Sequence, residues 1–213
     1  MKRPLALLIT GIFFASSVLA ATGDDWVKKG GEKMRTKDYR GAASMYEKAL
    51  QASPNNAKIA FLLGLSYADQ GKWDKAVPAM EQAAKEEPSF QAYHHLALIY
   101  ANQNQYEKSA QAFDEALKLS PSSYRAWYEL GLLHAANHHY DLAVQAYRKS
   151  AELNARFADA YLGLGSAYFG SGDKAQAAEQ VKQLETLGFK DKASALEQWL
   201  TNKEAKLKVK TQN

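Results

Sequence analysis

The sequence contains no cysteine and lacks the common motifs of catalytic and nucleotide-binding sites. The absence of cysteine excludes disulfide bonds, zinc–thiolate sites, thiol nucleophiles and an N-terminal lipidated cysteine. The sequence also has no G-x-S-x-G serine-nucleophile motif, no glycine-rich phosphate loop and no H-E-x-x-H zinc motif. These absences predict a protein that is not an enzyme, has no catalytic residues and uses no cofactor or metal ion.

The chain has little net charge outside its two ends. Of its 213 residues, 46% are hydrophobic and 23% are charged, a composition typical of soluble globular proteins. The formal charge of +4 comes from Lys2 and Arg3 and from residues 201–213, which hold four lysines and one acidic residue. Residues 21–200 hold 21 basic and 22 acidic side chains. Because no aromatic residue separates the lysines of the tail, we expect a solvated basic terminus rather than a site for nucleic acid or anionic lipid.

The first twenty residues have the layout of a secretory signal peptide. Lys2 and Arg3 precede an uncharged apolar run, and small residues follow up to Ala20, where we predict cleavage. The alternative is an uncleaved membrane anchor, because residues 4–23 carry no charge and are long enough to span a bilayer. Both alternatives place the remainder of the chain outside the cytoplasm, so we predict a periplasmic or secreted protein, membrane-anchored if the signal is kept.

A pattern of large and small residues recurs along the chain with a period of about 34 residues. Each copy has a large residue, then Leu and Gly or Ala, then Tyr or His, and later a small residue followed by a large one. The four clear copies are Ala60-x-x-Leu63-Gly64-x-x-Tyr67 with Ala76 and Met80, Tyr93-x-x-Leu96-Ala97-x-x-Tyr100 with Ser109 and Phe113, Trp127-x-x-Leu130-Gly131-x-x-His134 with Ala143 and Tyr147, and Tyr161-x-x-Leu164-Gly165-x-x-Tyr168 with Ala177 and Val181. A weaker copy begins at Trp26. Apolar residues three and four apart predict two amphipathic helices in each copy.

These spacings resemble the tetratricopeptide repeat, and the resemblance covers residues 23–191 in five consecutive copies. It implies an all-α fold, a right-handed superhelix (α-solenoid) of about five helix-turn-helix repeats. The mid-helix glycines predict close approach of the paired helix. Residues 192–203 are amphipathic and predict a C-terminal capping helix. We therefore divide the chain into a signal peptide (1–20), a solenoid with its cap (21–200) and a basic, frayed tail (201–213).

The resemblance also implies a site, because the first helix of each repeat lines the inner wall of such a superhelix and usually contacts a peptide there. We define the stripe as the fifteen residues expected to face this groove. They are Lys58, Phe61, Leu65, Asp69, Gln91, His94, Leu98, Asn102, Arg125, Tyr128, Leu132, Asp159, Leu162, Ser166 and Phe169. Phe61, Leu65 and His94 stand where chaperone-binding relatives carry Lys or Asn for a peptide's terminal carboxylate. A co-chaperone role is therefore not expected.

The five histidines, all in the third and fourth repeats, support an alternative. His134 and His138 are four residues apart, a spacing that allows metal binding on a continuous helix. However, His134 occupies the packing position of the repeat tyrosines, and His138 falls at the predicted turn. The main prediction is thus a non-catalytic scaffold that binds a protein or peptide in a cell-envelope assembly such as secretion, pilus or cell-wall machinery. The alternatives are a metal- or pH-responsive module and a self-associating structural protein.

Overall fold

The computed structural model describes residues 23–210, and the side chains of residues 23–207. The predicted signal peptide lies outside these residues. Within them the chain forms eleven helices and no strand. The helices are α1 (Gly23–Arg35), α2 (Tyr39–Ala52), α3 (Ala57–Ala68), α4 (Trp73–Glu86), α5 (Phe90–Asn102), α6 (Tyr106–Leu119), α7 (Tyr124–Ala136), α8 (Tyr140–Leu153), α9 (Ala158–Ser171), α10 (Lys174–Thr186) and α11 (Lys190–Lys210).

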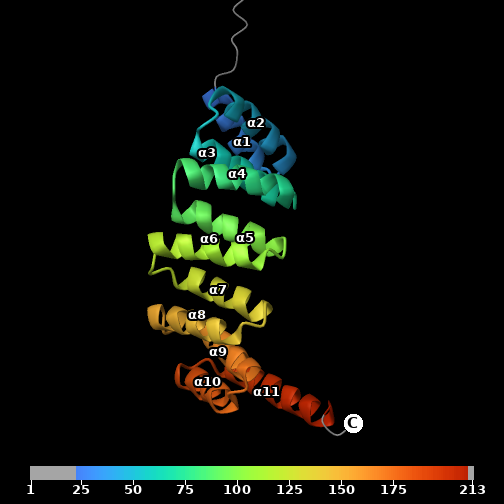
Figure 1. Ribbon diagram of the computed structural model, residues 1–213, viewed down its shortest axis with the longest axis vertical. Coiled ribbons are helices and arrows are strands. Elements are labelled where there is room, and N and C mark those ends of the chain that lie inside the picture. The colour runs from blue at the N-terminus through green and yellow to red at the C-terminus, as the bar shows by residue number, and fades with distance from the viewer. Residues whose placement is uncertain (1–22, 211–213) are drawn as a thin grey trace, which may run out of the picture.

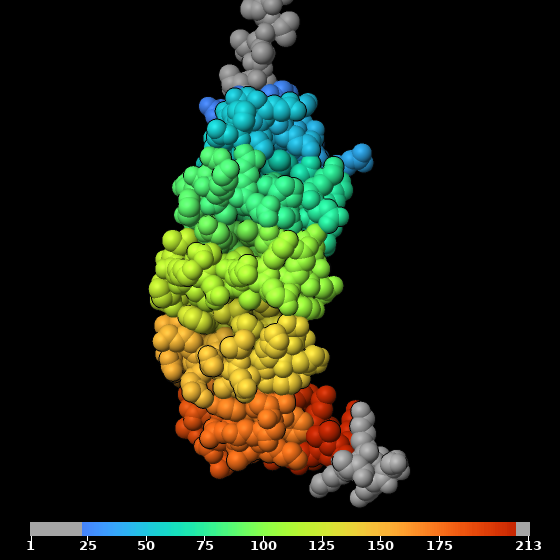
Figure 2. Space-filling model, in the orientation of Figure 1, coloured from blue at the N-terminus to red at the C-terminus, as the bar shows by residue number. Residues whose placement is uncertain are grey.

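The first ten helices form five antiparallel pairs that stack along one axis, and α11 follows the last pair (Figure 1). Each helix packs against the next one in the chain, and α11 also packs against α9. Figure 2 shows the pairs as successive bands and the end of α11 projecting beside the last band. The predicted all-α solenoid of five repeats with a capping helix is confirmed. No helix within residues 23–210 has the length and apolar character needed to cross a membrane.

The turn inside every repeat has the same backbone geometry. One residue adopts a left-handed conformation, and the next amide donates a hydrogen bond of 2.9 Å to a carbonyl five residues earlier, as in His139 N to His134 O. This geometry closes the C-terminus of the first helix by satisfying one of its unpaired carbonyls. The left-handed residues are Lys37, Gly71, Asn104, His138 and Gly172. His138 therefore lies in the turn after α7, as predicted, and does not share a helical face with His134.

Two of the mid-helix glycines allow the close approach predicted for them. A Cβ atom added to Gly131 would lie 2.5 Å from the ring of Tyr147 on the paired helix α8, and one added to Gly64 would lie 2.9 Å from Met80 on α4. Gly165 differs, because its nearest neighbour is Leu196 of α11. The capping helix therefore packs closely against α9 at this glycine.

At the three repeat tyrosines Tyr67, Tyr100 and Tyr168, a polar contact joins the repeat to the previous one. The hydroxyl of Tyr67 donates to Glu47, and burial together with this carboxylate raises the pKa of Tyr67 to about 12. Tyr100 donates in the same way to Glu81, and Arg148 donates to the hydroxyl of Tyr168 at 2.8 Å. The sequence separation is 20, 19 and 20 residues respectively. The same kind of contact therefore recurs at these three tyrosines with nearly the same sequence separation.

The C-terminal helix is longer than its sequence predicted. It begins at Lys190 and ends at Lys210, whereas the prediction was residues 192–203. Residues 201–210, which the sequence assigned to the basic tail, are thus part of α11; the last three residues lie outside the described part of the chain. Pro78 lies inside α4, and the helix continues through it.

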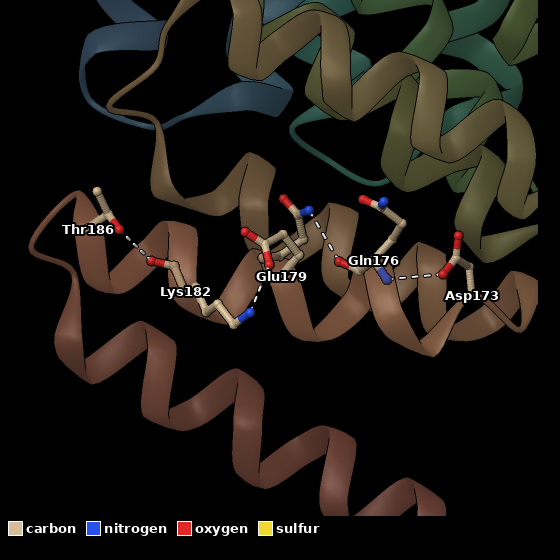
Figure 3. Close-up of polar contacts among 6 residues, drawn as sticks. Asp173, Gln176, Glu179, Lys182 and Thr186 are labelled. Atoms are coloured by element: carbon tan, nitrogen blue, oxygen red, sulfur yellow. Dashed lines mark hydrogen bonds and ion pairs between the residues drawn. The ribbon is translucent and has the colours of Figure 1, made fainter.

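The surface polar groups of α10 that Figure 3 labels find their partners within the same helix or at its cap. Asp173 caps the helix by accepting from the amide of Gln176 at 3.0 Å, and Lys182 lies 3.1 Å from Glu179. Thr186 donates to the carbonyl of Lys182. All of these partners are three or four residues apart, so they stabilise one helix without contacting a neighbouring repeat.

Candidate functional site

The stripe predicted from the sequence lies on α3, α5, α7 and α9, and none of its fifteen side chains is fully buried. Six of them are exposed, namely Lys58, Asp69, Gln91, Asn102, Arg125 and Leu132. The others are partly buried, because they pack against the neighbouring first helix while part of the side chain stays accessible. The stripe thus offers both polar and apolar groups to solvent.

The part of the stripe on α5 is tied to α3 and α7 through its histidines. The ring of His94 stacks on Phe90 with centroids 5.2 Å apart, and its Nε2 contacts the carboxylate of Glu129 on α7. His95 meets Phe61 of α3 edge-on at 5.4 Å. Burial lowers the pKa of His95, and neighbouring His94 lowers it further. His94 and His95 therefore form part of the packing between three repeats.

The part of the stripe on α7 combines a packed aromatic residue with an exposed leucine. Tyr128 lies 5.1 Å from Phe157 and 5.6 Å from Tyr147, measured between ring centroids, and burial raises its pKa. Leu132, one turn further along the helix, is 46% exposed. Arg125, one turn before Tyr128, is also exposed. Leu132 is therefore the apolar side chain of the stripe best placed to contact a partner.

The α9 end of the stripe is partly occupied by the capping helix. The carboxylate of Asp159 pairs with Lys192, and the ring of Phe169 meets Trp199 edge-on at 5.6 Å. Both partners belong to α11. Asp159 and Phe169, which the sequence placed on the groove wall, therefore contact the capping helix. Because α11 occupies the position of a next first helix, it packs against them as one repeat packs against another.

Two hollows include stripe residues. One, of about 220 Å³, lies between the second and third repeats and is lined by Lys58, Phe61 and Gln91 among others. The second, of about 470 Å³, lies between the α7–α8 turn, α9 and α11. Its lining includes Ser166 and Phe169 from the stripe together with Trp199, Lys203 and Lys206. These three α11 residues were not predicted from the sequence to line a site. Their spacing of four and three residues nevertheless places them on one helical face.

The remaining histidines do not form a compact cluster with the α5 pair. The rings of His134 and His139 are 6.3 Å apart, and Nδ1 of the exposed His138 lies 2.9 Å from the hydroxyl of Tyr140. Burial lowers the pKa of His134, and His139 lowers it further, whereas Asp114 raises it. Within the described residues, no group of three or more His, Asp or Glu side chains is arranged to hold a metal ion.

Several buried or half-buried groups with shifted pKa values lie in contacts between helices. Tyr67 and Tyr100 donate to carboxylates of the preceding repeat, which together with burial raises their pKa values. Burial also raises the pKa of Asp114, which lies on α6 near His134. None of these three residues lines either of the two hollows. The shifts therefore indicate packing and not a reacting site.

A family model described as tetratricopeptide repeat matches the chain at residues 28–92, 61–124, 94–155 and 128–188. Together these overlapping matches cover residues 28–188, which include at least part of each of the five repeats. No curated protein sequence matches the chain. No enzyme family is therefore indicated by these comparisons.

Solved structures share the fold over most of the chain. A crystal structure of MamA protein has a TM-score of 0.75 and 28% identity, and the match covers 80% of this chain and 94% of that one. A MamA structure from Desulfovibrio magneticus RS-1 has a TM-score of 0.71, 18% identity and coverage of 78% and 94%. YrrB, described as a TPR protein with an unusual peptide-binding site, has a TM-score of 0.72, 16% identity and coverage of 84% and 93%. The last two similarities show the fold alone.

Proposed function

This chain belongs to the tetratricopeptide repeat family, and on that premise we propose that it is a non-catalytic scaffold that holds a segment of a protein partner against the stripe. The observation that carries the proposal is the exposure of Leu132 beside half-buried aromatic residues on α7. An apolar centre with a polar rim is typical of peptide-binding surfaces. The peptide-binding site named for YrrB, which shares the fold, supports the same kind of use.

Leu132 and Leu142 form a matched pair for testing this proposal. Leu132 is 46% exposed on the first helix α7, and Leu142 is 44% exposed on the second helix α8. The same substitution at both positions changes charge and hydrophobicity equally, but only Leu132 belongs to the stripe. Tyr128 is less suitable, because it packs against Tyr147 and Phe157 and its replacement would also disturb folding.

We expect Leu132→Glu to weaken partner binding by about tenfold or more, because a central apolar contact is replaced by a charge. Leu142→Glu should leave binding within about twofold. The measurement is the amount of partner recovered with each purified variant from solubilised cell envelopes, after circular dichroism has shown equal helix content. A photo-crosslinking residue placed at 132 or 142 in living cells gives a second readout. Equal recovery and equal crosslinking at the two positions would remove the stripe as the binding surface.

Export and membership of a cell-envelope assembly are part of the proposal and rest on residues 1–20. Their basic start, apolar run and small residues before Ala21 support secretion across the cytoplasmic membrane. We expect the mature chain to begin at Ala21 and to fractionate with periplasmic or envelope proteins. Intact-mass measurement checks the cleavage site. A cytoplasmic chain that retains Met1–Lys2–Arg3 would contradict the proposal.

A further inference from the structure

The hollow of about 470 Å³ at the C-terminal end of the solenoid, which we call the cap pocket, exists because α11 is longer than the first helix of a repeat. The first helices α5 and α7 each have 13 residues, whereas α11 has 21. Its second half therefore extends beyond the last pair, as Figures 1 and 2 show. Ala135 of the α7–α8 turn region and Phe169 of α9 line the pocket from the opposite side.

The floor of the cap pocket contains two aromatic rings. Phe169 and Trp199 meet edge-on with centroids 5.6 Å apart, and Trp199 remains 37% exposed. Indole and phenyl rings contribute large apolar areas, and covering them with an apolar side chain is favourable. Among residues 23–207, the side chains around the rings leave part of Trp199 accessible to solvent. The rings are therefore available to a side chain of a partner.

Two lysines, Lys203 and Lys206, also line the cap pocket. Nζ of Lys203 lies 5.3 Å from the centroid of the Trp199 ring, and Lys206 follows on the same helical face. Among residues 23–207, no carboxylate forms an ion pair with either lysine; the nearby Glu204 pairs instead with Lys174 at 3.3 Å. The pocket thus presents two uncompensated positive charges beside an apolar floor, whereas residues 21–200 are almost neutral.

We propose that the cap pocket binds an acidic peptide segment of a protein partner, with a large apolar or aromatic side chain on the Phe169–Trp199 floor and adjacent carboxylates at Lys203 and Lys206. This inference rests on the proposed function only in taking the partner to be a protein. Charge complementarity identifies the acidic groups, and the pocket volume suits a side chain with its neighbouring backbone. Because the aromatic rings line a hollow, a peptide fits better than a membrane surface, which an amphipathic helix contacts with an open apolar face.

Peptide binding to the mature full-length protein tests the inference by fluorescence anisotropy. The probe is a fluorescein-labelled peptide with a central tryptophan between glutamates, in a Gly-Ser flanking sequence. Two matched peptides replace the glutamates by lysines or the tryptophan by alanine. We expect the acidic tryptophan peptide to bind at least about tenfold more tightly than either matched peptide, and binding to weaken as salt rises from about 50 mM to about 300 mM.

The double variant Lys203→Glu/Lys206→Glu should weaken binding of the acidic peptide by about tenfold or more. The control, Lys85→Glu/Lys108→Glu, changes the net charge equally on the second helices α4 and α6; Lys108 also lies over an aromatic ring, that of Tyr100, at 5.4 Å. The control should remain within about twofold of the unmodified protein. An equal loss in both double variants would mean that net charge alone attracts the peptide, and would overturn the inference.

Two further outcomes separate this inference from its alternatives. Loss of peptide binding in Leu132→Glu but not in Lys203→Glu/Lys206→Glu would place the acidic peptide on the stripe and overturn the cap-pocket assignment while supporting the proposed function. Phosphatidylcholine vesicles containing phosphatidylglycerol serve as the membrane probe. Vesicle binding that depends on Lys203 and Lys206, without binding of the acidic peptide, would assign the lysines to a lipid surface and also overturn the inference.

Discussion

Contacts between first helices span many more residues than the surface ion pairs of the second helices, although Glu47, Glu81 and Arg148 of the second helices also contact the next repeat. On the first helices, His94 contacts Glu129, 35 residues further along the chain, and Asp159 contacts Lys192, 33 residues further. On the second helices, ion pairs such as Glu115–Lys118 and Glu179–Lys182 join residues three positions apart. The first helices therefore hold consecutive repeats in register, while the surface pairs of the second helices act within one helix.

This difference has a consequence for function. Contacts between repeats fix the relative positions of side chains on α3, α5, α7 and α9, so the stripe is a preorganised surface, and a partner does not have to order it on binding. Exposed pairs three residues apart contribute little to stability and serve mainly to keep the surface soluble. The first helices are consequently the better place for a binding surface.

Tyr147 gives the largest expected effect and tests whether second helices also join the repeats. Its buried ring lies against both Gly131 of α7 and Gly163 of α9, so it fills the space between two first helices. We expect Tyr147→Ala to lower the free energy of unfolding by about 3–5 kcal/mol, because a large cavity is left. Urea denaturation followed by circular dichroism measures the loss.

Tyr147→Phe is the control, because it keeps the ring that fills this space. We expect it to unfold at nearly the same urea concentration as the unmodified protein. A loss below about 1 kcal/mol for Tyr147→Ala would mean that the stack relaxes around this site. The coupling of the fourth and fifth repeats would then rest on other contacts, such as that of Arg148 on α8 with Tyr168 on α9.

His134 gives a smaller effect, which depends on pH. It occupies the position of the repeat tyrosines, which contact the previous repeat. It lies near Asp114 of α6. Burial holds its pKa below the usual value. The stability that neutral His134 supports is therefore present above about pH 6.5 and is lost as the pH falls through the lower pKa of the folded chain. We expect the thermal midpoint to fall on acidification over this range.

His134→Tyr should reduce this dependence on pH and raise the thermal midpoint by about 2–4 °C at pH 6, because a tyrosine can donate to Asp114 as Tyr100 donates to Glu81. Differential scanning calorimetry at several pH values measures the change. His139→Gln, which removes only the second cause of the lowered pKa, should retain most of the dependence. Glu179→Gln breaks a surface pair of a second helix and should leave the midpoint nearly unchanged. An unaltered pH profile in His134→Tyr would assign the dependence to other groups, including His95.

The sequence predicted the repeat positions well and the end of the solenoid less well. Gly131 and Tyr147 could be paired from their spacing alone, because neighbouring helices of a repeat are close in sequence. The contact of Gly165 with Leu196 could not, since Leu196 belongs to α11, which lies outside the repeat pattern. Likewise, the contact between Asp159 and Lys192 depends on how α11 docks on α9, which no motif specifies.

By itself, the sequence determined the all-α class, the number of repeats and the helix faces, because a period of about 34 residues can bury its apolar side chains only by stacking identical helix pairs. Tertiary structure decided where the stripe ends and that α11 extends to Lys210. It also brought Phe169 together with Trp199 and placed Lys203 above that pair. These features arise where the repeat stops, and the packing of a non-repeating helix depends on the surface left exposed by the last repeat.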